Sequence, residues 1–241
     1  MKLLFISLGC DKNLVDSEEM LGMLAADGHE IVDDEDEAEV IIVNTCCFIG
    51  DAKEESVNTI LEMAEKKKAG TCKVLIVTGC MAQRYQKEII EEVPEVDAVL
   101  GTTSYGDIVK ALEEAAAGNH FEEYRDIDYL PDTGSKRVLT TGGHFGYLKI
   151  AEGCDKHCTY CIIPKIRGNF RSVPMERLLK EAQDLAEQGV KELILVAQET
   201  TVYGKDLYGE KSLHKLLREL CKISGIQWIR ILYCYPKEIY D

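Results

Sequence analysis

The sequence lacks three features that would place the protein in a membrane, outside the cell or on nucleic acid. No apolar run approaches the roughly 20 residues that cross a bilayer. Residues 1–10 carry a lysine and end in Leu8-Gly9-Cys10, but their apolar run, 3–6, is far shorter than the roughly 7–15 residues of a secretory signal core. Positive charge is also scarce, because 28 Lys and Arg face 43 Asp and Glu and leave a net charge of −15. We therefore expect a cytoplasmic protein with no membrane contact, for which nucleic acid is an improbable direct substrate.

Cysteine, in contrast, is abundant. The 241 residues include ten cysteines, and 46% of the chain is hydrophobic, enough for one large domain or two modest ones. Without a secretory signal, disulfides are a poor explanation for so many cysteines. Thiolates bound to metal in a reducing cytosol explain them better.

The first part of the chain alternates apolar runs with helical patterns. Runs at 3–10, 40–46 and 74–80 each end in two small or polar residues and a cysteine, and 97–101 resembles a fourth strand. Helices are predicted from Asp16, which can act as an N-cap with Glu19 three residues on, and over 53–68, 83–92 and 105–117. The fold class predicted is α/β, with an open, Rossmann-like parallel sheet.

This fold would bring three distant cysteines together. In an open parallel sheet, ligands bind beyond the carboxyl ends of the strands, where Cys10, Cys46 and Cys80 stand at a shared register. We expect a three-thiolate site there; the alternative is three unrelated buried cysteines. Cys47 is one residue out of register and should point elsewhere. Three further cysteines have no such pattern and are expected to be core or surface thiols: Cys72, Cys221 and Cys234.

Turn residues interrupt the alternation before it resumes. The predicted domains are 1–118, a linker at 119–143, and 144–241. In the last, strands are expected at 147–151, 192–197 and 228–233, with helices opened by Pro174 and Ser212. This is the start of a β/α barrel, and its open edge after the third strand leads us to expect a fragment of a longer protein.

The densest cysteine motif follows the first strand of this second region. Cys154, Cys158 and Cys161 are spaced C-x3-C-x2-C. Soft thiolates so close together suit an iron–sulfur cluster or zinc. Three ligands leave one metal position open for a substrate or cofactor. A zinc knuckle completed by a distant fourth ligand is the alternative from spacing alone.

The same loop resembles that of the radical S-adenosylmethionine (SAM) enzymes, which usually carry an aromatic residue, here Tyr160, before the last cysteine. Together, the two cysteine sets resemble the radical SAM methylthiotransferases, in their RimO branch. The matching phrases cover essentially the whole chain: 7–18 (SLGCDKNLVDSE), 44–46 (NTC), 77–85 (VTGCMAQRY), 152–154 (EGC), 163–168 (IPKIRG) and 196–201 (VAQETT). Asp11 and Cys47 depart from the usual wording, but neither removes a ligand.

The resemblance implies two [4Fe–4S] clusters, one on Cys154, Cys158 and Cys161 that binds SAM, and an auxiliary one on the N-terminal trio that carries sulfur. The activity implied is addition of a methylthio group to the β-carbon of an aspartate in a small-subunit ribosomal protein, with an electron donor and a sulfur source as partners. Tyr160 and Gln198 are candidate SAM contacts. No side chain is assigned a catalytic acid–base role.

Other assignments remain open. Lys165 and Arg167 either screen cluster charge, contact the SAM carboxylate or face solvent. The sister branch, which methylthiolates an adenosine in tRNA, is the alternative enzyme. A non-catalytic iron–sulfur binding fragment and a structural zinc protein are the alternatives from other classes.

Overall fold

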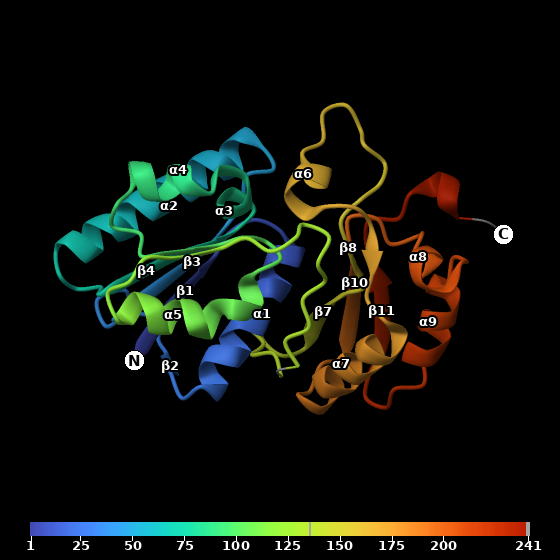
Figure 1. Cartoon of the computed structure of the whole chain (residues 1–241). Helices are drawn as coiled ribbons and strands as arrows, with labels where there is room; N and C mark the ends of the chain where they lie inside the picture. Colours follow the sequence, from blue (N-terminus) through green and yellow to red (C-terminus); the bar gives the residue numbers. More distant parts are fainter. Residues whose placement is uncertain (135, 240–241) are drawn as a thin grey trace. The chain divides into compact units, whose positions relative to one another are not determined.

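A computed structural model describes residues 1–134 and 136–239 (Figure 1). The chain divides into two compact units, Met1–Val138 and Leu139–Asp241. Within the described residues, no helix is long and apolar enough to cross a membrane.

The first unit is built on a parallel sheet. In the described residues it has six strands in the order β2-β1-β3-β4-β5-β6, and every neighbouring pair is parallel. The strands are β1 (Lys2–Ser7), β2 (Glu30–Ile31), β3 (Val40–Thr45), β4 (Val74–Gly79), β5 (Ala98–Leu100) and β6 (Phe121–Glu123). The open parallel sheet predicted from the alternating apolar runs is confirmed.

Helices cover both faces of this sheet (Figure 1). On one face lie α1 (Asp11–Ala26) and α5 (Ile108–Ala116), preceded by the 3-10 turn η1 (Tyr105–Asp107); on the other lie α2 (Gly50–Lys68), α3 (Cys80–Tyr85) and α4 (Lys87–Glu92). Alternate strand residues such as Val40 and Ile42 pack with Met20 and Leu24 of α1 in one core. Because strand side chains alternate between faces, the intervening buried residues, such as Ile41, serve the opposite face.

Three local expectations need correction. Helix α1 begins at Asp11, not at Asp16, which lies buried inside it. Residues 83–92 do not form one helix, because Gln86 has a φ of 42° and separates α3 from α4. The stretch interpreted as a linker, 119–143, contains the sheet strand β6, and the boundary between the compact units falls within it, after Val138.

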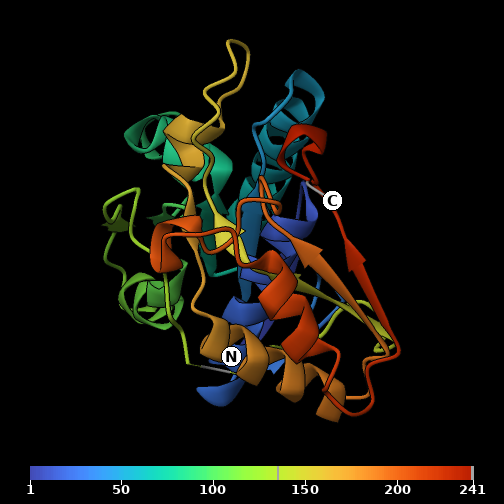
Figure 2. The ribbon, with the colours of Figure 1, turned by 90° about the vertical axis from the view of Figure 1, so that its right-hand side faces the viewer.

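The second unit is organised around three parallel strands in the order β11-β10-β7 (Figure 2). They are β7 (Phe145–Lys149), β10 (Glu192–Val196) and β11 (Trp228–Ile231). Helices α7 (Met175–Glu187) and α9 (Leu213–Leu220) connect them, and α7 buries Leu178, Ala182 and Leu185. This strand–helix alternation confirms the start of a β/α barrel.

Smaller elements complete the described part of the second unit. They are the antiparallel pair β8 (Ala151–Glu152) and β9 (Arg171–Ser172), the short helix α6 (Ile163–Arg167), α8 (Lys205–Tyr208) and the 3-10 turn η2 (Pro236–Glu238).

Candidate functional site

The three N-terminal cysteines stand at the carboxyl ends of three adjacent strands. Cys10 is the N-cap of α1, Cys46 follows β3 directly, and Cys80 is the first residue of α3 after β4. Strands β1, β3 and β4 are neighbours in the sheet, with Asn44 paired to both Ser7 and Thr78. The strand order therefore places these three cysteines at the carboxyl end of the sheet, as the sequence predicts.

Asn13, in the first turns of α1, contacts two of these thiols and two of the loops that carry them. The thiols of Cys10 and Cys80 donate to its Oδ1 at S···O distances of 3.9 and 3.7 Å. Its Nδ2 donates to the carbonyl oxygens of Leu8, at 3.1 Å, and Thr45, at 2.9 Å. One buried side chain therefore connects the ends of the cysteine-bearing strands.

Two glycines allow the loops to approach this closely. Gly9 has a φ of +94°, and a Cβ placed on it would lie 2.7 Å from the Cβ and 3.0 Å from the Sγ of Cys46. Gly79 has a φ of +92°, and its Cβ would lie 2.2 Å from Asn44 Oδ1 and 2.6 Å from the carbonyl oxygen of Thr45. Both positions need the left-handed backbone that glycine adopts without a steric penalty.

The other buried thiols of this unit face the backbone. Cys47 donates to the carbonyl oxygen of Cys80 at 3.2 Å, and Cys72 donates to that of Val74 at 3.0 Å. Burial raises the pKa of both Cys47 and Cys72, which disfavours the thiolate that would bind metal. Cys221 and Cys234 are exposed.

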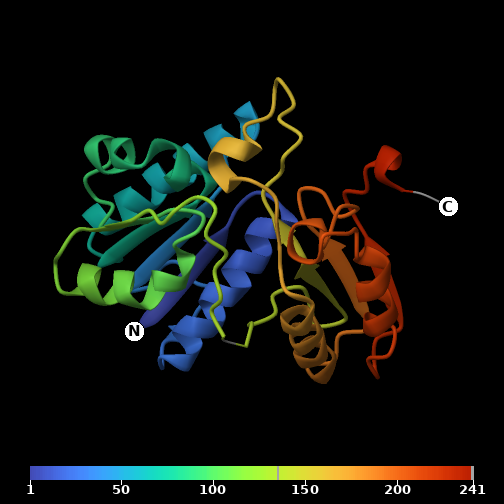
Figure 3. The same ribbon diagram turned by 45° about the vertical axis from the view of Figure 1, so that its right-hand side comes forward.

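The second candidate site lies on the loop between β8 and α6, drawn in gold in Figure 3. Its base is fixed by hydrogen bonds from Cys154 N to Gly168 O, at 3.1 Å, and from Phe170 N to Asp155 Oδ1, at 2.8 Å. Gly153 allows this, since a Cβ there would lie 2.0 Å from the carbonyl oxygen of Asn169.

The thiols on this loop are more accessible than the N-terminal ones. Cys154 and Cys161 are half-buried, and Cys158 is exposed. A turn joins the last two, in which Cys161 N donates to Cys158 O at 2.9 Å. Burial raises the pKa of the Cys154 thiol, so that metal binding there must release a proton.

A buried ion pair links the two elements that flank the loop, β8 and α6. Arg167 Nη1 donates to Glu152 Oε2 at 2.8 Å, and both side chains are at most 3% exposed. Burial alone would raise the pKa of Glu152, but the positive charges of Arg167, Lys149 and Arg171 hold it well below its usual range. Arg167 therefore does not face solvent, the role left open from the sequence.

Gln198 joins this pair from the end of β10. Its Nε2 lies 3.4 Å from Glu152 Oε1, while its Oε1 is buried and has no hydrogen-bond partner among the residues that the structure describes. Such an unsatisfied acceptor is uncommon in a protein interior and marks a place where a ligand can donate. The strand end that carries it is where barrel enzymes place ligand contacts.

Lys156 anchors the middle of the cysteine loop. It lies 3.2 Å from Glu199 Oε2 and 3.6 Å from Glu238 Oε1, and its Nζ stands 3.8 Å from the centre of the Tyr235 ring. Partial burial opposes the charge, but the hydrogen bond to Glu199 raises the pKa of Lys156, which keeps it positive. The loop is thus tied to the segments after β10 and β11.

The thiols of the described residues are not arranged as a complete metal-binding site. In the part of the chain that it describes, no group of three or more His, Cys, Asp or Glu side chains is arranged to hold a metal ion. Tyr160, a candidate SAM contact, is 87% exposed. Sequence reasoning missed Asn13, Glu152 and Lys156 as site residues, although each lies within or beside a phrase that carried the family resemblance.

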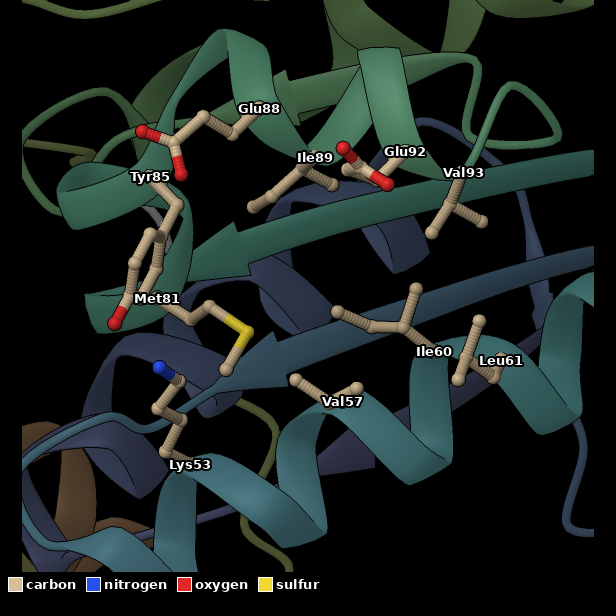
Figure 4. A pocket seen from close by; sticks show the side chains of 10 residues that line it. All are labelled: Lys53, Val57, Ile60, Leu61, Met81, Tyr85, Glu88, Ile89, Glu92 and Val93. Carbon is tan, nitrogen blue, oxygen red and sulfur yellow. The ribbon is translucent and has the colours of Figure 1, made fainter.

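An apolar pocket of about 240 Å³ lies apart from the thiols in the first unit (Figure 4). None of the ten cysteines lines it. Its lining comes from α2, α3, α4 and the residue after α4: Lys53, Val57, Ile60, Leu61, Met81, Tyr85, Glu88, Ile89, Glu92 and Val93. The walls are mostly aliphatic, so they supply no converging set of polar groups for chemistry.

Comparison with known proteins assigns both halves of the chain. Residues 2–101 match UPF0004, described as an uncharacterized protein family, and residues 148–238 match the radical SAM superfamily. The chain is 66% identical over 241 residues to a protein of Lachnoclostridium phytofermentans named ribosomal protein uS12 methylthiotransferase RimO, covering all of this chain and 55% of that protein. The chain belongs to the radical SAM methylthiotransferase family.

Other relatives agree. A protein of the same name from Clostridioides difficile is 52% identical over 241 residues, covering 100% of this chain and 54% of its own length. The chain thus spans about half the length of the curated relatives it matches. Membership of the radical SAM superfamily implies a [4Fe–4S] cluster and SAM.

Solved structures show the same fold at low identity. The radical SAM methyltransferase TsrM from Kitasatospora setae, with tryptophan substrate and a SAM analog bound, matches with a TM-score of 0.56 and 14% identity, over 90% of this chain and 50% of that one. The cobalamin-dependent radical enzyme OxsB gives a TM-score of 0.51 over 92% of this chain and 36% of that one, also at 14% identity.

Proposed function

We propose that the chain is the cluster-bearing part of an enzyme that adds a methylthio group to the β-carbon of an aspartate in ribosomal protein uS12. One observation carries the proposal: two three-cysteine sets, each at strand ends of its own α/β unit, occur in a chain with 66% identity to RimO along its whole length. The proposed setting is cytoplasmic, with an electron donor and a sulfur source as partners.

In this proposal, Cys154, Cys158 and Cys161 hold the cluster that binds SAM. The donor set fits, because three soft thiolates on one accessible loop leave a metal position open. A bound cluster and SAM supply the radical chemistry needed to replace an unactivated C–H bond with a C–S bond. The chain's own part is to fix the loop through Lys156 and to offer the unsatisfied Oε1 of Gln198 to a donor group of SAM. Tyr160 is exposed and is retained as a second candidate contact.

Cys10, Cys46 and Cys80 are proposed to hold the second, auxiliary cluster. All three are free thiols, and they stand at neighbouring strand ends. Cys10 is the N-cap of the 16-residue helix α1, whose N-terminus stabilises negative charge. These residues would hold the cluster and exclude bulk water from it, since Cys46 and Cys80 are buried.

The alternative substrate is an adenosine in tRNA. The net charge of −15 disfavours it, because an acidic surface repels a phosphate backbone and attracts a basic protein. The relatives at 52–66% identity that are named for uS12 favour the protein substrate as well.

Iron and sulfide analysis after anaerobic reconstitution tests the cluster assignment. The proposal expects about eight irons per chain in two cubane clusters, falling to about four in the Cys154→Ala/Cys158→Ala/Cys161→Ala variant. The reciprocal Cys10→Ala/Cys46→Ala/Cys80→Ala variant should also hold about four. A Cys72→Ala/Cys221→Ala variant, which removes thiols outside both sets, is the control and should keep about eight. Four irons in the wild type and none in the first variant would refute the auxiliary cluster.

A further inference from the structure

We infer that Asn13 is a positioning residue for the N-terminal thiol set, and that its neutral amide sets the redox potential of a cluster bound there. The inference rests on the proposed function, in which Cys10, Cys46 and Cys80 hold that cluster. It goes beyond the proposal because Asn13 is neither a cysteine nor a SAM contact.

The first argument is that Asn13 reaches all three cysteine-bearing junctions. Its Oδ1 is within 3.9 Å of the sulfurs of Cys10 and Cys80, and its Nδ2 binds the carbonyl oxygen of Thr45, the residue before Cys46. A Cβ on Gly9 would meet both Asn13 Nδ2, at 3.3 Å, and Cys46 Sγ, at 3.0 Å, so the amide and the third thiol both border Gly9.

The second argument is that the amide is itself held in place. The backbone carbonyl of Asn13 accepts hydrogen bonds from Asn44 Nδ2, at 2.9 Å, and from Ser17 Oγ, at 2.9 Å. Asn13 is fully buried, and Asn44 lies at the end of β3. Because this backbone is fixed and Nδ2 also donates to the carbonyl oxygens of Leu8 and Thr45, the side chain is held in one orientation beside the sulfurs.

The third argument is electrostatic. A carboxamide carries no net charge, so its oxygen repels neighbouring thiolates far less than a carboxylate oxygen would. Aspartate has almost the same shape but would place a negative charge beside at least two sulfurs in a buried setting, where Coulomb forces are strong. Hydrogen bonding and charge next to the sulfurs are among the factors that set the reduction potential of an iron–sulfur cluster.

The test uses the Cys154→Ala/Cys158→Ala/Cys161→Ala chain, so that only the N-terminal set is loaded. Asn13→Asp is compared with Asn58→Asp, which makes the same charge change at an exposed position of α2. The readouts are iron per chain, the rate of iron loss to a chelator, and the midpoint potential measured by electron paramagnetic resonance. Circular dichroism checks that each variant is folded, and Asn13→Ser serves as a second, uncharged variant should Asn13→Asp not fold.

We expect Asn13→Asp to lose iron at least tenfold faster and to have a more negative midpoint potential, with Asn58→Asp unchanged. For Asn13→Ser, we expect faster iron loss with a smaller shift in potential. Loss rates within twofold of the parent and an unchanged potential in a folded Asn13 variant would overturn the inference while leaving the proposed function intact. A parent chain that binds no iron would overturn both.

Discussion

At the residue scale, the pairing of Arg167 with Glu152 predicts a large effect of a single substitution. Arg167→Met would leave the Glu152 carboxylate buried without its partner, which costs about 3–5 kcal/mol. Urea unfolding of the iron-free chain at pH 7 measures this loss. The double variant Arg167→Met/Glu152→Leu is the matched control, and it should recover most of the stability because neither charge of the pair remains.

The same pair predicts a pH dependence. The pKa of Glu152 is lowered in the folded chain, so its carboxylate adds stability at neutral pH. That contribution declines as the pH falls below the ordinary glutamate pKa of about 4.3 toward the lower folded value. In Glu152→Gln this part of the acid sensitivity should disappear. An unchanged slope of unfolding free energy against pH below 5 would contradict the assignment.

At the element scale, the strand-to-helix junction before Cys80 depends on glycine. Gly79→Ala must adopt a φ of +92° and also place its Cβ against Asn44 Oδ1 and Thr45. We expect a loss of more than about 2 kcal/mol of unfolding free energy, together with reduced iron binding. Gly28→Ala is the matched control, because its φ is +88° but, apart from its chain neighbours, no atom of the described residues lies within 4 Å of the added Cβ.

Gly28→Ala should therefore cost only the backbone strain, about 1 kcal/mol, and leave iron binding unchanged. If the two variants lose equal unfolding free energy, backbone strain alone explains the cost of Gly79→Ala. The close approach of β3 and β4 then adds nothing to it. Chemical denaturation monitored by circular dichroism separates the two cases, with iron content as the second readout.

The element scale also shows what the sequence could predict. Apolar runs such as 40–46 and 74–80 identified the central strands because buried parallel strands are apolar on both faces. The start of α1 was misplaced because its first turns bury polar residues, among them Asn13 and Asp16, which no apolar periodicity marks. The same burial puts Asn13 among the thiols, so the error in the helix and the missed site residue have one cause.

Contacts between residues far apart in the sequence could not be predicted, for a different reason. Lys156 meets Glu199 and Glu238 only because loops after different strands converge in the folded unit. Gln198 could be proposed from its place at a strand end, but the unsatisfied state of its Oε1 needed coordinates. The C-x3-C-x2-C motif could be recognised directly because its three cysteines lie close together in the sequence. The prediction for Cys10, Cys46 and Cys80 depended instead on a correct strand order.

At the scale of the whole molecule, the net charge of −15 predicts which macromolecule the protein binds. A protein that binds ribosomal RNA is itself basic, so an acidic chain attracts it. The same acidic chain repels the phosphate backbone of tRNA. We expect the iron-loaded chain to bind purified uS12, with an affinity that falls several-fold between 50 and 200 mM salt because the attraction is screened. Fluorescence anisotropy with labelled uS12 and with labelled tRNA measures both interactions.

The shape of the salt dependence separates charge attraction from specific recognition. A basic protein of similar size and charge but unrelated fold is the control, and it should bind more weakly than uS12 at 200 mM salt, where screening leaves mainly short-range contacts. Tighter binding to tRNA than to uS12 at either salt concentration would reverse the choice of substrate. It would also require a basic patch on this chain strong enough to overcome the repulsion between its net charge of −15 and the RNA backbone.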